Sequence, residues 1–245
     1  MTAAGPGSAK LTVVLVHGAF AESASWNGVI PPLAAAGYRV IAAGNPLRSV
    51  STDAASVASV IDSIRGPVLL VAHSYGGTVI SVAAAGKDKV IGLVYVAAFA
   101  AAVGESTAEL TGRYPGSTLA ETVVQVPLPG GGVDLSIEQD KFHEQFCQDV
   151  PADVAALMAA TQRPLTHAAL TERATAAAWT DVPSFFVIPT ADRSIPPDAQ
   201  RFMAERAGSR RTVEVQDASH AVAESQPPVV ADVVLDAAEA LAPEG

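Results

Sequence analysis

Ser74 lies in the stretch VAHSYGG, residues 71–77, where it could act as a nucleophile. A catalytic serine of this kind needs a sharp turn from a strand into a helix, with small residues two positions before and after it. Ala72 and Gly76 meet this need, so AHSYG is a conservative variant of the pattern GxSxG. The alternative is a serine that only caps the following helix, as most serines before helices do.

His220, in the stretch QDASHAV, is the candidate general base for that serine. A general base needs an imidazole between the serine hydroxyl and an orienting carboxylate, and a late position suits the chain order serine, acid, histidine. Among the other histidines, His17 and His73 lie inside motifs, and His143 and His167 lie in a long insertion. We interpret His17 as a structural histidine that hydrogen-bonds within its own loop.

Asp192, in VIPTADRSIPP, is the candidate acid because it follows an apolar strand. Catalytic groups of open parallel sheets gather at the carboxyl ends of the strands. An aspartate that stabilises its own turn is the alternative. Asp181 precedes the strand at the wrong edge, Asp198 suits the first turn of a helix, and Asp217 is expected to shape the loop that carries His220.

The stretch VLVHGAF, residues 14–20, ends the first apolar run and could help to bind an oxyanion. Acyl transfer needs two backbone N–H donors about 3 Å from the developing negative charge. We expect Ala19 and Tyr75 to supply them. This chemistry requires no metal and no organic cofactor, and the single cysteine, Cys147, forms neither a zinc motif nor an internal disulfide.

Six apolar runs of strand length must position these residues. The first five are nearly continuous in apolar character, as strands covered on both faces are, so they predict a parallel sheet. Helical patterns between them indicate βαβ units. The runs span residues 11–16, 39–44, 67–72, 90–99, 184–189 and 211–216.

Three of the intervening helices have recognisable ends. Ser51 and Thr52 are expected to cap the first, which stops before Gly66 and Pro67. Pro197 opens the second at the position that proline favours. The third carries an apolar stripe over residues 229–241.

Residues 100–182 break the alternation of strand and helix. Residues 122–137 predict a hairpin around a glycine turn, and helical patterns follow at 138–148 and 152–160. A long excursion between two strands of one sheet is commonly a lid. We expect its apolar face to come from Phe142, Phe146, Val154, Leu157 and Met158, and a substrate pocket to be lined by Phe20, Phe99, Phe142, Phe146 and Met158.

Composition excludes several classes of function. The 245 residues are 49% hydrophobic, enough for one α/β domain or two small ones. A formal charge of −10 without a basic block excludes nucleic acid as a partner. Residues 1–10 lack the features of a signal peptide, and no apolar run is long enough to span a membrane. We therefore expect a cytoplasmic protein with a disordered amino terminus at residues 1–10.

The chain resembles the α/β-hydrolase superfamily through VVLVHGAF, VAHSYGG, TADRSIP and ASHAV. It looks most like the compact branch of plant methylesterases and hydroxynitrile lyases. The resemblance implies an α/β-hydrolase fold, with a six-stranded, mostly parallel sheet and helices on both faces, built from residues 11–99 and 183–245, and a lid at 100–182. It implies Ser74 as nucleophile, His220 as base, Asp192 as acid, and Ala19 with Tyr75 as oxyanion donors.

Departures from the family patterns make two activities of the superfamily less favoured. Ala221 stands where such hydroxynitrile lyases have a lysine, which disfavours cyanohydrin cleavage, and a serine at the elbow disfavours dehalogenation. We expect a serine hydrolase that cleaves a small carboxylic ester or lactone through an acyl-enzyme. A perhydrolase or cofactor-free oxygenase on the same fold, and a small-molecule receptor of this fold, are the alternatives.

Overall fold

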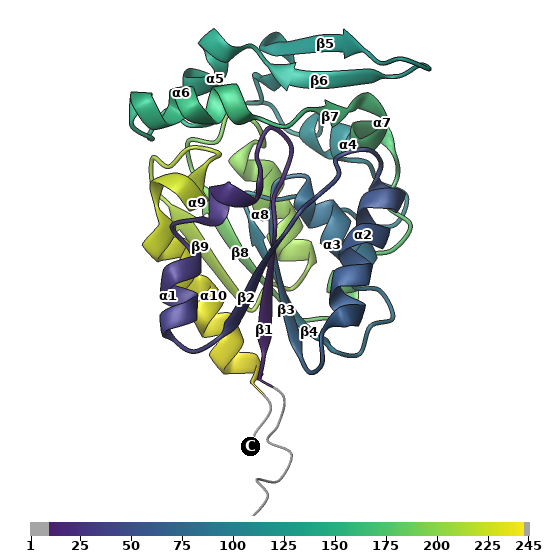
Figure 1. Ribbon diagram of the computed structural model, residues 1–245, viewed down its shortest axis with the longest axis vertical. Coiled ribbons are helices and arrows are strands. Elements are labelled where there is room, and N and C mark those ends of the chain that lie inside the picture. The colour runs from purple at the N-terminus through teal and green to yellow at the C-terminus, as the bar shows by residue number, and fades with distance from the viewer. Residues whose placement is uncertain (1–9, 243–245) are drawn as a thin grey trace, which may run out of the picture.

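The computed structural model describes residues 10–242, which form a six-stranded sheet with helices packed against it (Figure 1). The strand order is β2-β1-β3-β4-β8-β9, and every neighbouring pair is parallel, which confirms the predicted fold. The expected disordered amino terminus lies outside the described residues apart from Lys10. The strands are β1 Thr12–Val16, β2 Arg39–Ala43, β3 Val68–His73, β4 Val90–Val96, β8 Ser184–Pro189 and β9 Arg211–Val215.

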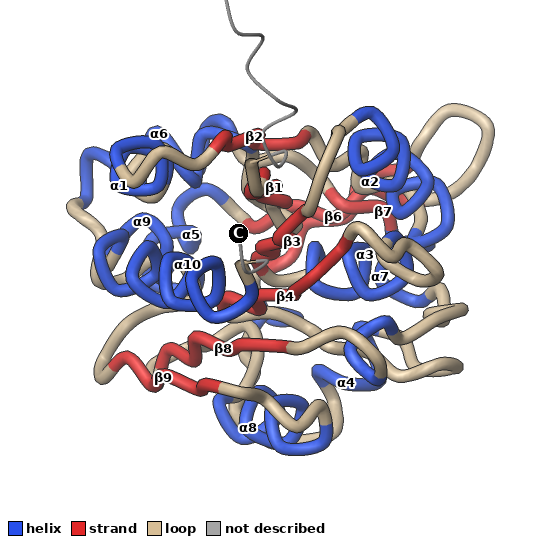
Figure 2. The backbone as a smooth tube through the Cα atoms, turned by 90° about the horizontal axis from the view of Figure 1, so that it is seen from below, coloured by secondary structure: helices blue, strands red, loops and turns tan. Residues whose placement is uncertain are grey.

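Both faces of the sheet are covered, which explains why the central strands are apolar throughout. Val13 and Leu15 of β1 pack on one face with α1 (Ile30–Ala35) and α10 (Pro227–Leu241). Val14 and Val16 pack on the other face with α2 (Val50–Ser63), α3 (Gly76–Ala83) and α8 (Pro197–Arg206). Figure 2 shows these helices around the sheet. Alternate residues of one strand thus enter two separate cores.

Helix α2 starts earlier than the sequence predicted. Its N-cap is Ser49, whose side chain accepts a hydrogen bond from the Thr52 N–H at 3.1 Å. Ser51 and Thr52 lie inside the first turn, so their prediction as caps was wrong. Ser49 is the last residue with extended backbone before the helix, φ −165°, as an N-cap requires. The proline start of α8 at Pro197 is confirmed.

The strand predicted at residues 90–99 is shorter in the structure. β4 ends at Val96 because Ala97 adopts a left-handed backbone, φ 45°, which an extended strand cannot accommodate. The Ala97 N–H still donates to the Val187 carbonyl at 2.9 Å. The chain then leaves the sheet edge toward residues 100–182, which we call the inter-strand segment.

The inter-strand segment lies over the carboxyl ends of the sheet strands, at the top of Figure 1. The predicted hairpin is confirmed as β5 (Val123–Pro127) and β6 (Val133–Ile137), and the two-residue strand β7 (Leu165–Thr166) extends it. The predicted helices are present as α5 (Gln139–Phe146) and α6 (Ala152–Thr161). The short helices are η1 Ser23–Trp26, α4 Thr107–Thr111, η2 Leu119–Glu121, α7 His167–Thr171, η3 Ala178–Thr180 and α9 Val222–Ser225.

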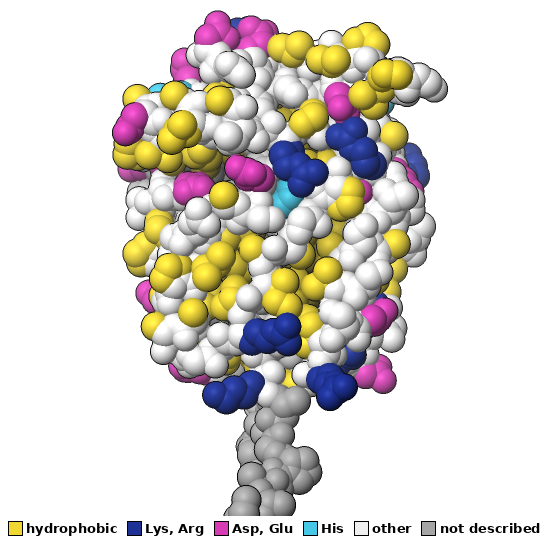
Figure 3. Space-filling view, viewed as in Figure 1, with side chains coloured by type: hydrophobic (Ala, Val, Ile, Leu, Met, Phe, Trp, Pro, Cys, Tyr) yellow, Lys and Arg dark blue, Asp and Glu magenta, His cyan; other side chains and the backbone are white. Residues whose placement is uncertain are grey.

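For two of the five residues predicted to form the apolar face of this segment, the prediction is wrong because they are exposed. Phe142 and Phe146 are buried, but Val154 and Leu157 are 36% and 68% exposed. Helix α6 instead buries the small residues Ala155 and Ala159, one turn apart on its inner side. Hydrophobic atoms therefore show on the surface above the sheet in Figure 3.

Ion pairs tie the inter-strand segment to the core. Arg206 of α8 binds the Glu105 carboxylate at 2.6 Å, and Arg48 binds Asp134 of β6 at 2.7 Å. The Phe20 N–H also donates to the Arg163 carbonyl at 3.0 Å. Within residues 10–242, no helix has the length and apolar character needed to cross a bilayer.

Candidate active site

Ser74 occupies the turn between β3 and α3. Its backbone is left-handed, φ 53°, a conformation that is uncommon for a residue with a side chain. The turn is held by hydrogen bonds, because the Ser74 N–H donates to the Ala97 carbonyl and its own carbonyl accepts from the N–H groups of Gly77 and Phe99. A strained residue persists where its surroundings fix it in this way.

Neighbouring glycines let the chain approach the serine closely. A Cβ atom at Gly18 would lie 2.6 Å from the Ser74 Cβ, and one at Gly76 would lie 2.8 Å from the Val16 carbonyl oxygen. Neither position has room for a side chain. Ala72, in contrast, is buried in β3 opposite Val16 with its methyl group in the core. The alanine in AHSYG is therefore compatible with the turn.

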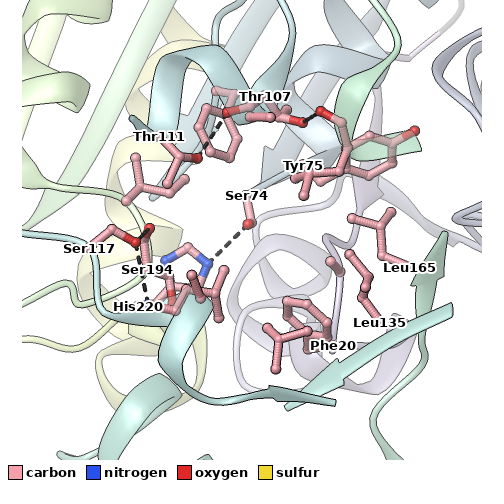
Figure 4. A pocket seen from close by; sticks show the side chains of 18 of the residues that line it. Phe20, Ser74, Tyr75, Thr107, Thr111, Ser117, Leu135, Leu165, Ser194 and His220 are labelled. Carbon is pink, nitrogen blue, oxygen red and sulfur yellow. Dashed lines mark hydrogen bonds between the residues drawn. The ribbon is translucent and has the colours of Figure 1, made fainter. Parts of the chain in front are cut away.

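His220 bridges Ser74 and Asp192. Its Nε2 lies 3.0 Å from the Ser74 Oγ, and its Nδ1 lies 2.7 Å from the Asp192 Oδ2. Figure 4 shows the His220 ring directed at the serine hydroxyl. The side chains of His220 and Asp192 are almost completely buried. The structure thus brings together the three residues that the sequence predicted to act as one unit.

Asp192 also stabilises its own turn, as the alternative interpretation of this residue expected. Its Oδ1 accepts from the N–H groups of Ser194 and Ile195 at 2.7 and 2.9 Å, and its Oδ2 accepts from the Gln200 side chain at 2.8 Å. A buried carboxylate needs such donors to offset its lost hydration. Asp217 instead lies on an exposed turn, where it accepts from the Gln216 side chain.

His73 supports the loop that carries His220, a role the sequence did not indicate. Its Nε2 donates to the His220 carbonyl at 3.0 Å, and the two ring centroids are 4.7 Å apart. Burial lowers the pKa of His73 well below 6.5, so the ring is neutral and can keep a single N–H for this bond. The position of His73 beside Ser74 was the only available signal.

His17 is held within its own region by both ring nitrogens. Nδ1 donates to the Gly18 carbonyl at 2.9 Å, and Nε2 accepts from the Asn45 N–H at 3.0 Å. Burial lowers the pKa of His17 to about 4, so the ring is neutral. The Gly18 bond lies within the loop of His17, as its structural interpretation predicted, whereas the Asn45 bond ties His17 to the loop after β2.

Tyr75 directly follows Ser74, and Ala19 follows Gly18, whose backbone approaches the Ser74 side chain. Among residues 10–242, neither amide donates to any acceptor, so both remain available to a ligand. The Tyr75 hydroxyl donates to Asp53 at 2.9 Å, and burial next to that carboxylate raises the pKa of the phenol. The phenol therefore stays neutral and anchors the Tyr75 backbone.

A cavity of about 500 Å³ opens above Ser74 and His220 (Figure 4). Phe20, Phe99 and Phe146 line it as predicted. Phe142 does not; it packs behind Phe146 with ring centroids 5.0 Å apart. Met158 borders a smaller void beside His73 instead. A cavity of this size accommodates a small organic molecule.

Sequence reasoning missed many residues of this cavity. They come chiefly from the inter-strand segment, where residues 107–119 have no periodic apolar pattern that could have indicated a pocket. The missed residues that matter below are Thr107, Thr111, Ser117, Leu135, Leu165 and Ser194.

Comparison with known proteins identifies the family. The sequence profile of the Alpha/beta hydrolase family matches residues 13–233. Alpha/beta hydrolase nvfD of Aspergillus novofumigatus is 28% identical over 251 residues, which cover 94% of this chain and 97% of that protein. Pyrethroid hydrolase of Sphingobium wenxiniae is 29% identical over 255 residues, which cover 93% and 88% of the two chains. Esterase PIR7B of Oryza sativa subsp. japonica is 27% identical over 258 residues, with 93% and 96% covered.

Solved structures share the fold. Polyneuridine aldehyde esterase matches with a TM-score of 0.79 at 21% identity, covering 94% of this chain and 99% of the other. Methylesterase MES16 from Arabidopsis matches with a TM-score of 0.74 at 19% identity, covering 94% and 100%. Together with the family profile, which extends over most of the sequence, these likenesses establish that the chain belongs to the alpha/beta hydrolase family.

Proposed function

We propose that the protein is a serine hydrolase that cleaves a small carboxylic ester or lactone through an acyl-enzyme. The observation that carries the proposal is the hydrogen-bonded series from Ser74 through His220 to Asp192, with distances of 3.0 and 2.7 Å, beneath a cavity of about 500 Å³. Relatives named as a pyrethroid hydrolase and as an esterase support the same class of reaction.

Acylation uses the groups that surround Ser74. The hydroxyl passes its proton to His220 Nε2 as Ser74 Oγ attacks the ester carbonyl carbon. The N–H groups of Ala19 and Tyr75 are free to stabilise the oxyanion that forms. His220 then gives the proton to the departing alcohol oxygen, which leaves an ester between the acyl group and Ser74.

Deacylation repeats these steps with water. His220 Nε2 removes a proton from water, whose oxygen attacks the acyl carbon, and Ser74 Oγ recovers the proton as it leaves. Asp192 holds the imidazole with Nδ1 protonated and stabilises the imidazolium in both steps. The donors around Asp192 keep its second oxygen occupied, so the carboxylate stays oriented toward His220.

The inter-strand segment serves as the lid of this site in our proposal. Most residues that line the cavity belong to it, and the exposed ones at the cavity's edge include Gly116, Gln125 and His167. A substrate would therefore enter past residues of this segment. Phe20, Phe99 and Phe146 would contact its apolar parts.

An organophosphonate probe tests the proposal, because only an activated hydroxyl beside a base attacks such a reagent at neutral pH. We expect one stoichiometric adduct on Ser74 by peptide mapping, and hydrolysis of p-nitrophenyl esters, aryl esters or lactones that Ser74→Ala abolishes. Ser209→Ala, at a half-buried serine in the loop between α8 and β9, is the matched control and should label normally. An adduct on another serine, or ester turnover that survives Ser74→Ala, would contradict the assignment.

A further inference from the structure

We propose that the cavity selects esters whose alcohol portion carries a free hydroxyl or another hydrogen-bond donor. The recognising groups are the hydroxyls of Thr107, Thr111, Ser117 and Ser194, which we call the hydroxyl face. This inference rests on the proposed hydrolase function and specifies its substrate class.

Three hydroxyls of this face can only accept. The proton of Thr107 goes to the Leu170 carbonyl at 2.7 Å, that of Thr111 to the Thr107 carbonyl at 2.9 Å, and that of Ser117 to the Ser194 carbonyl at 2.9 Å. A hydroxyl has one proton and two lone pairs, so each oxygen keeps acceptor capacity after donating its proton, although the Ser117 oxygen already accepts from the Leu119 N–H at 3.5 Å. Acceptors of this kind bind donors, not carbonyl or ether oxygens.

Ser194 adds the clearest sign of a missing partner. Its Oγ is buried and has no hydrogen-bond partner among residues 10–242, although the residue lines the cavity. A buried hydroxyl without a partner is unfavourable, and exceptions to pairing often mark functional positions. Rotation between staggered side-chain conformers can turn this hydroxyl to a substrate group.

The opposite side of Ser74 is mainly apolar, and its polar residues Gln125 and His167 are exposed. Phe20, Leu135 and Leu165 lie across the serine from Thr111, Ser117 and Ser194 in Figure 4. The cavity therefore has two unlike halves, and a substrate with one apolar end and one hydroxylated end complements both.

Charged substrates do not fit these walls. The lining residues include no lysine, arginine, aspartate or glutamate within the described part of the chain, and His167 and His220 are the titratable side chains besides tyrosines. An ionised group would lose hydration here without gaining an ion pair. The donor we infer is therefore a neutral one, such as an alcohol or phenol.

The hydroxyl face lies on the side of the leaving group. The Ser194 N–H binds the same Asp192 carboxylate that binds His220, and the Ser117 hydroxyl binds the Ser194 carbonyl. His220 must deliver its proton to the departing alcohol oxygen, so the part of the ester on the His220 side is the alcohol portion. The apolar half then receives the acyl portion.

Three isosteric esters test this inference: propyl butyrate, 2-hydroxyethyl butyrate and propyl 3-hydroxypropanoate. We expect kcat/KM, divided by the alkaline hydrolysis rate, to be about fivefold higher for 2-hydroxyethyl butyrate than for propyl butyrate, the effect of one neutral hydrogen bond. A wholly apolar pocket would instead disfavour the hydroxylated ester about tenfold, since its hydroxyl would be buried unpaired. That result, or a preference for propyl 3-hydroxypropanoate, would overturn the proposal.

Variants assign the preference to the hydroxyl face. At least one of Thr111→Val and Ser194→Ala should lower the ratio of the two butyrate esters about fivefold, because one neutral hydrogen bond accounts for the preference, and Thr111→Ser should keep the wild-type ratio because it keeps the acceptor. Thr212→Val, at an exposed threonine of β9, is the matched control and should keep the wild-type ratio. A ratio that neither Thr111→Val nor Ser194→Ala changes would overturn the assignment of these residues.

Binding without turnover separates this proposal from the hydrolase proposal. Calorimetry on the Ser74→Ala protein should give a Kd about fivefold lower for 2-hydroxyethyl butyrate than for propyl butyrate. This preference with no hydrolysis by the wild type would support the inferred selectivity and contradict the hydrolase function. Hydrolysis by the wild type with equal Kd values for the two esters would support the hydrolase function and contradict the inferred selectivity.

Discussion

At the scale of single residues, Asp192 does two things that are hard to separate by inspection. It accepts from Ser194, Ile195 and Gln200 within its turn, and it binds the His220 ring. We predict that Asp192→Asn lowers kcat by about 10³- to 10⁴-fold, because an asparagine amide favours the wrong imidazole tautomer. Steady-state kinetics on the folded variant measure this loss.

Asp217→Asn is the control for that variant. Asp217 is three residues from His220 but lies on an exposed turn with left-handed backbone, φ 58°, a conformation that asparagine also tolerates. We expect Asp217→Asn to keep most of the activity. Circular dichroism should show that both variants are folded. If Asp217→Asn lost most of its activity while Asp192→Asn kept it, Asp217 rather than Asp192 would be the acid partner of His220.

His73 should act as a positioning residue through the backbone of His220. Its Nε2–H bond to the His220 carbonyl fixes the loop that carries the imidazole proposed as the general base. We predict that His73→Ala lowers kcat about 10- to 100-fold with little change in KM, since small misplacements of a reacting group have effects of this size. His73→Gln, which retains an N–H donor, should recover part of the loss.

His143→Gln provides the comparison for His73. His143 also hydrogen-bonds a carbonyl, that of Val150 at 2.8 Å, but in the inter-strand segment away from the cavity. A merely structural role for His73 would lower thermal stability without the kcat effect. Equal kinetic constants for wild type and His73→Ala would refute the positioning role.

At the scale of residues, the sequence predicted which side chains lie together only where a motif constrains the chain. Ser74, His220 and Asp192 each follow a strand, so the parallel sheet brings them to one edge. Ser194 and Thr111 carry no such constraint, because their place in the cavity depends on how an irregular segment packs over the sheet. Phe142 and Phe146 look alike in sequence, and only the packing of α5 decides which of them reaches the cavity.

At the scale of elements, the turn after β3 depends on glycines that no other residue can replace. A Cβ atom at Gly77 would lie 2.3 Å from the Phe99 carbonyl oxygen, which is backbone and cannot yield easily. We predict that Gly77→Ala lowers the melting temperature markedly and reduces activity, since the Ser74 carbonyl bonds both Gly77 and Phe99. Gly44→Ala, with no atom within 4 Å of its new Cβ, should be tolerated. Equal melting temperatures for the two variants would refute the role of this contact.

The bounds and buried faces of helices and strands could be predicted from sequence where the residue pattern within the element itself determines them. Apart from β4, which ends three residues before the predicted end, the strands were found to within one residue at either end, because a run covered on both faces is apolar throughout. The outer face of α6 was misjudged, since alanines at 155 and 159 pack inward while Val154 and Leu157 stay exposed. Choosing between such stripes requires knowledge of the neighbouring helix, which the sequence of α6 does not contain.

At the scale of the whole molecule, two buried histidines and one half-buried glutamate have opposite effects on the pH dependence of stability. His17 and His73 are held neutral, with the pKa of His17 lowered from 6.5 to about 4 by burial. Glu224, on α9 beside the void that His73 borders, has its pKa raised from 4.5 to about 7 by burial. The histidines disfavour folding at low pH, and the glutamate disfavours folding at high pH.

Whether the free energy of unfolding rises or falls with pH depends on which state of the chain, folded or unfolded, binds more protons. The unfolded chain binds more protons at the histidines as the pH falls below 6.5, so their contribution to the free energy of unfolding is complete above 6.5 and is lost as the pH falls. For His17 the loss is about 3 kcal/mol. The folded chain binds more protons at Glu224 between pH 4.5 and 7, so its contribution is lost as the pH rises. Between pH 4.5 and 6.5 the two effects partly cancel.

Glu224→Gln should remove the contribution of Glu224 to the pH dependence of the free energy of unfolding. A glutamine cannot ionise, so we predict that the variant has a higher free energy of unfolding than the wild type at pH 8 and that the difference shrinks toward zero below pH 4.5. Its stability should also fall more steeply than that of the wild type as the pH drops from 6.5, because only the histidines then titrate. Urea unfolding at a series of pH values measures both effects, with Glu121→Gln as the control at an exposed glutamate. A difference between Glu224→Gln and wild type that is the same at pH 4.5 and pH 8 would show that the carboxylate does not titrate differently in the two states.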